Sequence, residues 1–178
     1  MLRTPTCPPC ASTRPRTIAR PSPPPLLAAG YWNKPEATAA AFGGGWLRTG
    51  DVAREDPDGS WHIVDRVKDM IVTGGFNVFP REVEDVIATH PAVAQVGVIG
   101  VPDPTWGEAV TAIVVLRADA AQNGPASLAD ELKALVRDRK GPVQAPKHVI
   151  VADRLPLTAL GKPDKKALRA TYADRPFT

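Results

Sequence analysis

Four short groups of residues in this chain have the types and spacing that phosphate and sugar chemistry uses. Asp51 follows a glycine that lets the chain turn, and its carboxylate can accept from two vicinal hydroxyls, as on a ribose. Arg66 is a fork-shaped donor suited to a phosphate or a sugar. Lys162 follows a glycine just before a predicted helix, where its mobile point charge can reach a phosphate or a carboxylate.

Two adjacent glycines, Gly74 and Gly75, form the fourth group, because they permit positive φ angles and close approach of the backbone to an extended ligand. Each group also has a purely structural interpretation. Asp51 could cap a turn, Arg66 could pair with a neighbouring surface acid, the glycines could form a plain hairpin turn, and Lys162 could be a solvated lysine. The residues alone leave both interpretations open.

A β-hairpin is predicted to carry the first two groups. The segments Trp46–Val52 and Trp61–Val64 are short, aromatic and rich in β-formers, and they flank the turn signal Asp-Pro-Asp-Gly at residues 56–59. A second short strand pair is predicted at Met70–Thr73 and Asn77–Val78, on either side of the two glycines.

Helices and buried strands follow. Pro80 suits the first position of a helix that ends before Pro91, with acidic residues near its N-terminus and valines on one stripe. The β-branched runs Val93–Val101 and Ala109–Leu116 predict buried strands. The loop between them contains Trp-Gly-Glu at residues 106–108, which we interpret as structural.

The rest of the chain predicts two more helices and a strand. Ser127 and Asp130 suggest a capping box for a helix through Lys140, and Val149–Val151 predicts a short strand. The last helix is predicted from Pro163 to about Tyr172. Together these elements predict a compact α+β body of roughly 110 residues.

Charge is unevenly placed along the 178 residues. Residues 1–29 hold four of the 22 basic residues and none of the 19 acidic ones, so the remainder has 18 basic against 19 acidic residues and a net charge of −1. The basic character therefore belongs to the tail and does not indicate a nucleic-acid-binding body. The long predicted strands are also almost purely aliphatic, without the basic and aromatic residues of a sheet that binds RNA.

The tail itself predicts disorder. Residues 1–29 contain eight prolines, together with Cys7 and Cys10 in a C-x-x-C pattern that could be half a zinc site or a redox pair. No second pair exists and the three histidines are scattered, so no metal site is predicted. No stretch has the length and apolarity of a signal peptide or a bilayer span, and the cytoplasm is the expected compartment.

In this order the groups resemble one family, the AMP-forming adenylating enzymes, which include acyl-CoA synthetases, adenylation domains of peptide synthetases and luciferases. The resemblance covers residues 30–172 and begins with Gly-Tyr-Trp-Asn-Lys-Pro-Glu-Ala-Thr at residues 30–38. The run K-D-M-I-V-T-G-G-F-N-V-F-P-R-E-V-E at residues 68–84 and the segment Lys140–Lys147 look most like fatty-acid and related acyl-CoA ligases.

The resemblance implies the small C-terminal domain of the acyl-adenylate-forming enzymes, a β-hairpin plus a short mixed sheet flanked by about three helices. It divides the chain into a disordered tail at residues 1–29, a remnant of the large adenylating domain at 30–65, the AMP-binding enzyme C-terminal domain at 66–172 and a short tail at 173–178.

The resemblance also implies a reaction in two steps, in which ATP activates a carboxylic acid as an acyl-adenylate and coenzyme A then takes the acyl group. Asp51 and Arg66 would bind the nucleotide, and Lys162 would bridge carboxylate and phosphate. Lys68 would be the hinge between the two half-reactions, and Gly74, Gly75 and Phe76 would line the path of the coenzyme A thiol. ATP with Mg²⁺ and coenzyme A are implied as substrates, with no bound prosthetic group.

One departure from the family is large. The N-terminal domain with its Ser/Thr/Gly-rich phosphate loop and acyl pocket has no counterpart in this sequence. We therefore expect a fatty-acid-CoA ligase fragment that is inactive alone. The alternative is a non-catalytic module that docks onto, or complements, a separately encoded N-terminal half.

We also expect the chain to be the product of a truncated or frame-shifted ligase gene, because the composition changes abruptly near residue 29, where the resemblance begins. Sequencing the locus upstream checks this. An intact N-terminal ligase domain in another frame is the expected result, and unrelated DNA there would refute the idea.

Overall fold

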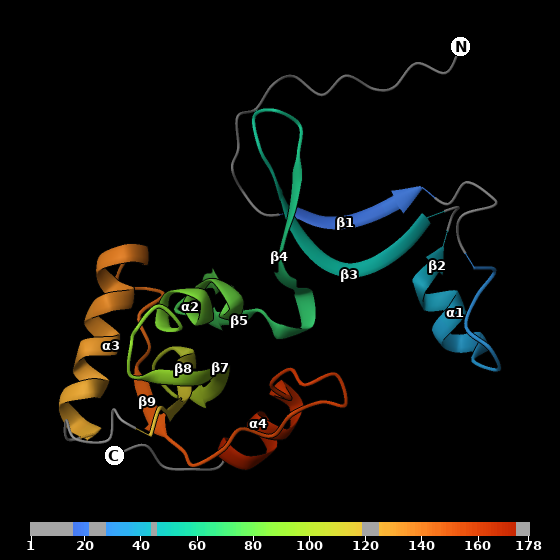
Figure 1. Cartoon of the computed structure of the whole chain (residues 1–178). Coiled ribbons are helices and arrows are strands. Elements are labelled where there is room, and N and C mark those ends of the chain that lie inside the picture. The colour runs from blue at the N-terminus through green and yellow to red at the C-terminus, as the bar shows by residue number, and fades with distance from the viewer. Residues whose placement is uncertain (1–15, 22–27, 44–45, 119–124, 174–178) are drawn as a thin grey trace. The chain divides into compact units, whose positions relative to one another are not determined.

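The computed structural model describes residues 16–21, 28–43, 46–118 and 125–173. The chain divides into two compact units, Met1–Val67 and Lys68–Thr178 (Figure 1). We call them the hairpin unit and the C-terminal unit, and each has its own sheet. Among the described segments, no helix combines the length and the apolar character needed to cross a membrane.

The hairpin unit is built on strand β3, Trp46–Glu55, which pairs antiparallel with β4, Trp61–Arg66. In the turn between them the Gly59 N–H donates to the Asp56 carbonyl at 2.9 Å. A two-residue strand, β2 at Phe42–Gly43, pairs with the start of β3. The predicted hairpin is therefore present, and both of its strands extend beyond the predicted ends.

One part of the tail departs from the prediction of disorder. Residues Arg16–Pro21 form strand β1, which pairs antiparallel with β3. This pairing is possible because the backbone of β3 offers hydrogen-bonding groups that a short segment can pair with whatever its composition. Residues 1–15, which include the C-x-x-C pair, and residues 22–27 and 174–178 lie outside the described residues.

Helix α1, Pro35–Ala41, has no counterpart in the prediction. Pro35 opens it, and the Thr38 hydroxyl donates to the Lys34 carbonyl at 2.8 Å. None of its residues is buried. Because the helix has no apolar stripe, the periodicity that reveals amphipathic helices is missing from its sequence.

Strand β8, Gly107–Leu116, is the centre of the sheet in the C-terminal unit. It pairs antiparallel with β7, Val93–Asp103, and parallel with β9, His148–Val151. At its start it also meets β5, Ile71–Thr73, which pairs with β6, Phe76–Val78. The sheet is therefore mixed, as predicted.

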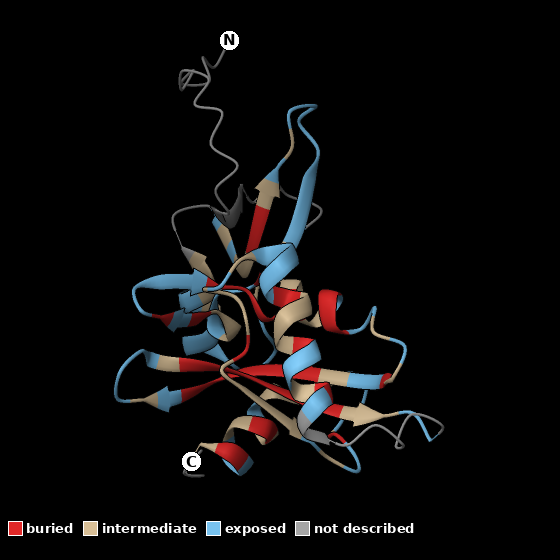
Figure 2. Ribbon diagram, turned by 90° about the vertical axis from the view of Figure 1, so that its left-hand side faces the viewer, coloured by how far each residue is buried: buried red, intermediate tan, exposed pale blue. Residues whose placement is uncertain are grey.

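Helices cover both faces of this sheet: α2 at Pro80–Ile87, α3 at Pro125–Lys140 and α4 at Lys165–Tyr172. Val98 on β7 packs in one core with residues of α2 and α3, whereas its neighbour Ile99 packs in a second core with residues of α4. Figure 2 shows buried residues along the central strands and on the inner sides of the helices. The predicted α+β class, with three helices around a mixed sheet, is confirmed for this unit.

Two helix starts differ from the prediction. Helix α3 begins at Pro125, so Ser127 lies inside its first turn and donates to Glu131 Oε1 at 2.9 Å instead of forming a capping box with Asp130. Helix α4 begins at Lys165, because the Asp164 carboxylate accepts from the first free backbone N–H groups and leaves Pro163 outside the helix.

His148 at the start of β9 is a titratable group of this unit whose pKa is shifted by the fold. Burial lowers the pKa of its imidazole below the usual 6.5, the charge of Lys133 lowers the pKa further, and the charge of Asp103 opposes both. The unfolded chain therefore takes up a proton at a higher pH than the folded chain. The stability contribution of this group is complete above pH 6.5 and is lost as the pH falls below it.

We expect the free energy of unfolding to fall less steeply in His148→Gln than in the native chain when the pH is lowered from about 7.5 to about 5.5, since the variant has no imidazole to protonate. Denaturant titrations at each pH measure the two slopes. Identical slopes would contradict the role assigned to His148.

Candidate active site

Asp51 and Arg66 face each other across the β3–β4 pairing. Arg66 Nε donates to Asp51 Oδ1 at 3.0 Å. The backbone on each side is also held, because the Asp51 N–H donates to Thr49 Oγ1 at 3.1 Å and the Arg66 N–H donates to Oδ1 of the buried Asp65 at 2.8 Å. The structure thus brings together the two residues predicted to bind the nucleotide.

This pair keeps much of its bonding capacity. Within the described part of the chain, the two terminal nitrogens of Arg66 and Oδ2 of Asp51 have no partner. The Arg66 side chain is 56% exposed, and an exposed ion pair contributes little stability. What the pair supplies is a carboxylate oxygen that can accept from hydroxyls, held beside two amino groups that can donate to a phosphate or a sugar.

Lys68 lies where one unit ends and the other begins. The single 3₁₀ turn Val67–Asp69 contains the boundary between Val67 and Lys68, and the Lys68 side chain is exposed. Hinges are a few residues at the ends of elements that can absorb changes of φ and ψ. The predicted hinge position therefore coincides with the boundary between the units, while the rotation about it stays a prediction.

Lys162 lies in a tight backbone hairpin, Leu157–Pro163, which we call the lysine hairpin. The Thr158 N–H donates to the Lys162 carbonyl at 2.8 Å, and the Lys162 N–H donates to Thr158 Oγ1 at 3.3 Å. Leu157 and Pro163 form a β-bridge at its base. The backbone that carries the lysine is therefore fixed by its own hydrogen bonds.

The ammonium group of Lys162, by contrast, has no hydrogen-bond or ion-pair partner among the described residues, and its side chain is exposed. Leu160 beside it is 86% exposed. A fixed backbone with a free cation is suited to electrostatic stabilisation of an anion that arrives from outside this unit.

Gly74 and Gly75 form the turn between β5 and β6, which we call the glycine hairpin. Their φ angles are 55° and 81°, in the left-handed region that favours glycine. Phe76, the next residue, is 60% exposed. The plain hairpin-turn interpretation is thus correct for the local backbone, and the turn also presents an aromatic ring to the outside.

The Trp-Gly-Glu turn between β7 and β8 holds the glycine hairpin from behind. The Gly74 N–H donates to the Trp106 carbonyl at 2.8 Å, and the Val72 N–H donates to Glu108 Oε2 at 2.7 Å. A Cβ added to Gly74 would lie 3.0 Å from the Trp106 ring. Lys147 Nζ lies 4.6 Å from the centre of the same ring, a cation–π contact.

The sequence predicted a structural role for this turn but did not connect it to the glycine hairpin. Val72 and Glu108 are 36 residues apart, and no periodic pattern links them. The available signal was local, since Asp103 sits where its side chain can accept from the N–H groups of Thr105 and Trp106, as it does at 2.8 Å.

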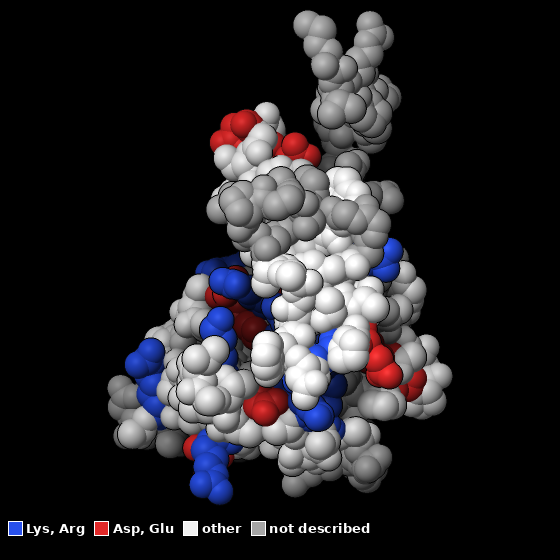
Figure 3. All heavy atoms as spheres, turned by 90° about the vertical axis from the view of Figure 1, so that its right-hand side faces the viewer, with Lys and Arg blue, Asp and Glu red and all other residues white. Residues whose placement is uncertain are grey.

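Metal binding has no support in the described segments, which contain no group of three or more His, Cys, Asp or Glu residues that could hold an ion. Cys7 and Cys10 lie outside them. On the face in Figure 3, basic side chains stand beside acidic ones. Lys140 and Glu82 also form an ion pair, at 3.2 Å.

Solved structures similar to this chain include adenylate-forming enzymes. The o-succinylbenzoate CoA synthetase MenE from Bacillus subtilis, in complex with its acyl-adenylate intermediate, is 37% identical with a TM-score of 0.70, covering 79% of this chain and 28% of that chain. The amide bond synthetase McbA from Marinactinospora thermotolerans is 44% identical with a TM-score of 0.71, covering 81% of this chain and 29% of that chain. The fold of this chain therefore matches that of the adenylate-forming enzymes.

Within that class, residues 82–162 match the family model of the AMP-binding enzyme C-terminal domain. The medium/long-chain-fatty-acid–CoA ligase FadD8 from Mycobacterium tuberculosis is 68% identical over 150 residues, covering 83% of this chain and 26% of the ligase. The resemblance inferred from the motifs is confirmed. The chain spans about a quarter of the length of that relative.

The two glycines of the hairpin provide a matched test of its packing. We expect Gly74→Ala to lower the free energy of unfolding by about 1–3 kcal/mol more than Gly75→Ala. Both variants force alanine into the left-handed region, but only the Gly74 methyl meets the Trp106 ring, whereas that of Gly75 meets no atom within 4 Å. Chemical denaturation followed by circular dichroism measures the difference, and equal losses would contradict the contact.

Proposed function

We propose that this chain is the C-terminal part of an ATP-dependent acyl-CoA ligase that acts on fatty acids. The observation that carries the proposal is the 68% identity over 150 residues with a protein named as a medium/long-chain-fatty-acid–CoA ligase. The exposed lysine hairpin, the Asp51–Arg66 pair and the glycine hairpin supply chemical groups that such a reaction needs.

In the first half-reaction, a carboxylate oxygen of the acid attacks the α-phosphorus of ATP, the bond to pyrophosphate breaks, and an acyl-adenylate forms. We assign to Lys162 the stabilisation of the negative charge shared by the carboxylate and the phosphate in this step. The free ammonium group on a rigid backbone supports this role. Mg²⁺ would accompany the phosphates of ATP, as it does in most enzymes of this nucleotide.

Asp51 and Arg66 have a binding role in this proposal. The Asp51 oxygen without a partner would accept from the ribose hydroxyls, and the terminal nitrogens of Arg66 would donate to the ribose or the phosphate. Their mutual contact at 3.0 Å places the two groups side by side for the nucleotide.

In the second half-reaction, the coenzyme A sulfur attacks the carbonyl carbon, the bond to the phosphate oxygen breaks, and AMP leaves while the thiol proton is lost. We assign the path of the thiol to Gly74, Gly75 and Phe76, and the rotation that exchanges this segment for Lys162 to a hinge at Lys68. The unit boundary between Val67 and Lys68 supports the hinge. Because the substrates are ATP and coenzyme A, we place the reaction in the cytoplasm.

We propose as a second possibility that the chain complements a separate N-terminal half. We expect no pyrophosphate release when the chain alone is mixed with ATP, Mg²⁺, fatty acids and coenzyme A. We expect release when the N-terminal part of the Mycobacterium tuberculosis ligase, about three quarters of its length, is added. A pyrophosphate-coupled assay measures both mixtures.

Two lysine variants test the role of Lys162 in the same assay. Lys162→Ala should lower pyrophosphate release in the complemented mixture by about 100-fold or more, since a positioned charge is worth that much in catalysis. Lys166→Ala removes another exposed lysine four residues away and should change little. Release by the chain alone would overturn the need for a second part. No release in either mixture, with both parts folded, or equal effects of the two variants, would contradict the proposed function.

A further inference from the structure

Helix α4 begins three residues after Lys162, so the position of this helix determines the position of the lysine hairpin. The connection is rigid. The Asp164 N–H donates to the Pro156 carbonyl at 2.8 Å, and the Asp164 carboxylate accepts from the N–H groups of Lys166 and Ala167 at 3.0 and 3.1 Å. The hairpin therefore has to move with the start of α4.

The apolar side of α4 lies on strand β7 at a glycine. A Cβ added to Gly97 would stand 2.8 Å from Leu168 Cδ1 and 3.6 Å from Pro163 Cβ. Leu168 is 1% exposed. Helix and hairpin base thus rest directly on the strand backbone, which fixes how closely they approach the sheet.

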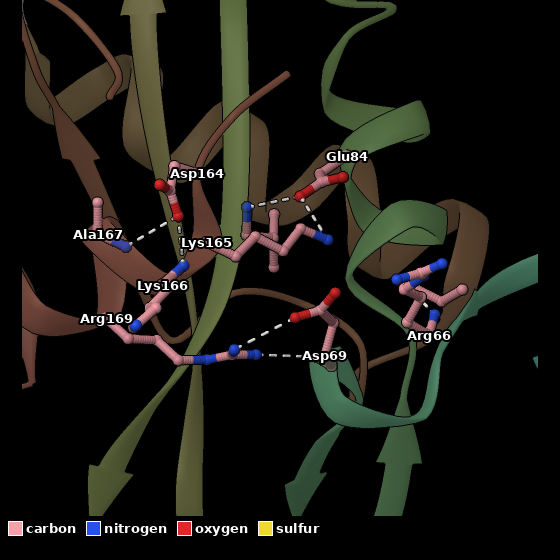
Figure 4. A network of polar contacts seen from close by, with 10 residues as sticks. Arg66, Asp69, Glu84, Asp164, Lys165, Lys166, Ala167 and Arg169 are labelled. Carbon is pink, nitrogen blue, oxygen red and sulfur yellow. Dashed lines mark hydrogen bonds and ion pairs between the residues drawn. The ribbon is translucent and has the colours of Figure 1, made fainter. Parts of the chain in front are cut away.

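Two ion pairs also hold α4 in place (Figure 4). Arg169 Nη1 lies 3.3 Å from Asp69 Oδ1, and Arg169 Nη2 donates to the Asp69 carbonyl at 3.2 Å. Lys165 Nζ lies 3.2 Å from Glu84 Oε1, which also accepts from the Val98 N–H at 2.9 Å. The first pair joins α4 to Asp69, the last residue of the 3₁₀ turn Val67–Asp69, and the second joins it to α2 and β7.

The Arg169 contact is the more informative of the two. A surface ion pair holds two flexible side chains in one of many geometries, whereas here a planar guanidinium binds both the carboxylate and the backbone carbonyl of one residue. The Asp69 side chain is only 16% exposed and that of Arg169 is 32% exposed. Contacts of this kind specify geometry more than they add stability.

We propose that Arg169, with Lys165 in support, is a positioning residue for the adenylation lysine: it holds the lysine hairpin at a fixed place relative to the turn Val67–Asp69. The proposal rests on the function proposed above, in which that turn contains the hinge. A rotation at Lys68 delivers Lys162 accurately only if the distance between hinge and hairpin is constant, and misplacement by about 1 Å can cost as much as 100-fold in rate.

The distance itself can be measured in the full chain without any activity. Pulsed electron paramagnetic resonance measures the distance between nitroxide labels attached at Lys68→Cys and Leu160→Cys. The substitutions Cys7→Ser and Cys10→Ser remove the native thiols. We expect a narrow distribution in the native background and a broader or shifted one with Arg169→Gln. Arg137→Gln is the matched control, because its side chain on α3 is 61% exposed and pairs only with the adjacent Asp138 among the described residues.

Assaying the two half-reactions separately distinguishes a positioning role of Arg169 from a general loss of structure. In the complemented mixture, Arg169→Gln should lower radiolabelled pyrophosphate exchange about tenfold, while thiolation of a supplied acyl-adenylate changes by less than about twofold. Asp69→Asn removes the other partner of the same contact and should give the same split, which provides a second variant if Arg169→Gln does not fold.

An unchanged distance distribution in both variants would overturn the proposal even if the ligase activity is established. Equal losses in both half-reactions would overturn it as well, since they would indicate a structural role alone. If complementation yields no activity, the proposed function fails, while the distance measurement still decides whether Arg169 holds the hairpin in place.

Discussion

The pairing of β7 with β8 is the interaction on which the rest of the C-terminal unit depends. It runs from Val93↔Leu116 to Asp103↔Gly107, and helices cover it on both faces. Each aliphatic side chain buried there contributes on the order of 1.5–3 kcal/mol. Within this unit, the glycine hairpin and the lysine hairpin are both held against this pair. The turn at its end supports the glycine hairpin, and the backbone of β7 supports α4 and the lysine hairpin.

Sequence patterns predicted the parts of this fold that bury apolar side chains. The β-branched runs at Val93–Val101 and Ala109–Leu116 became the two central strands, and Pro80 opens α2 as expected. The patterns missed two elements: β1 lies in a segment judged by composition, and α1 buries none of its residues. Periodicity reports burial, so it cannot find a helix such as α1, which has no buried residues.

For the candidate site, the sequence likewise predicted some features and not others. Residue type and order predicted Asp51, Arg66, Lys162 and the two glycines as one functional set, and the structure joins Asp51 to Arg66. The contacts that hold the hairpins could not be predicted, because they connect residues far apart in the chain. Arg169 and Asp69 are 100 residues apart, and Glu108 reaches Val72 across 36. Such contacts depend on the completed sheet and leave no local pattern.

Gly97 has a consequence for how this enzyme family could change. Helix α4 can approach the sheet closely because Gly97 of strand β7 has no side chain. Leu168 occupies the space that a Cβ at this position would need. At this position α4 and the base of the lysine hairpin lie directly on the backbone of β7. Altering the reach of Lys162 by substitutions within its own hairpin would disturb the hydrogen bonds that define it. A substitution at Gly97 would instead change the spacing between α4 and the sheet, because an added Cβ would meet Leu168.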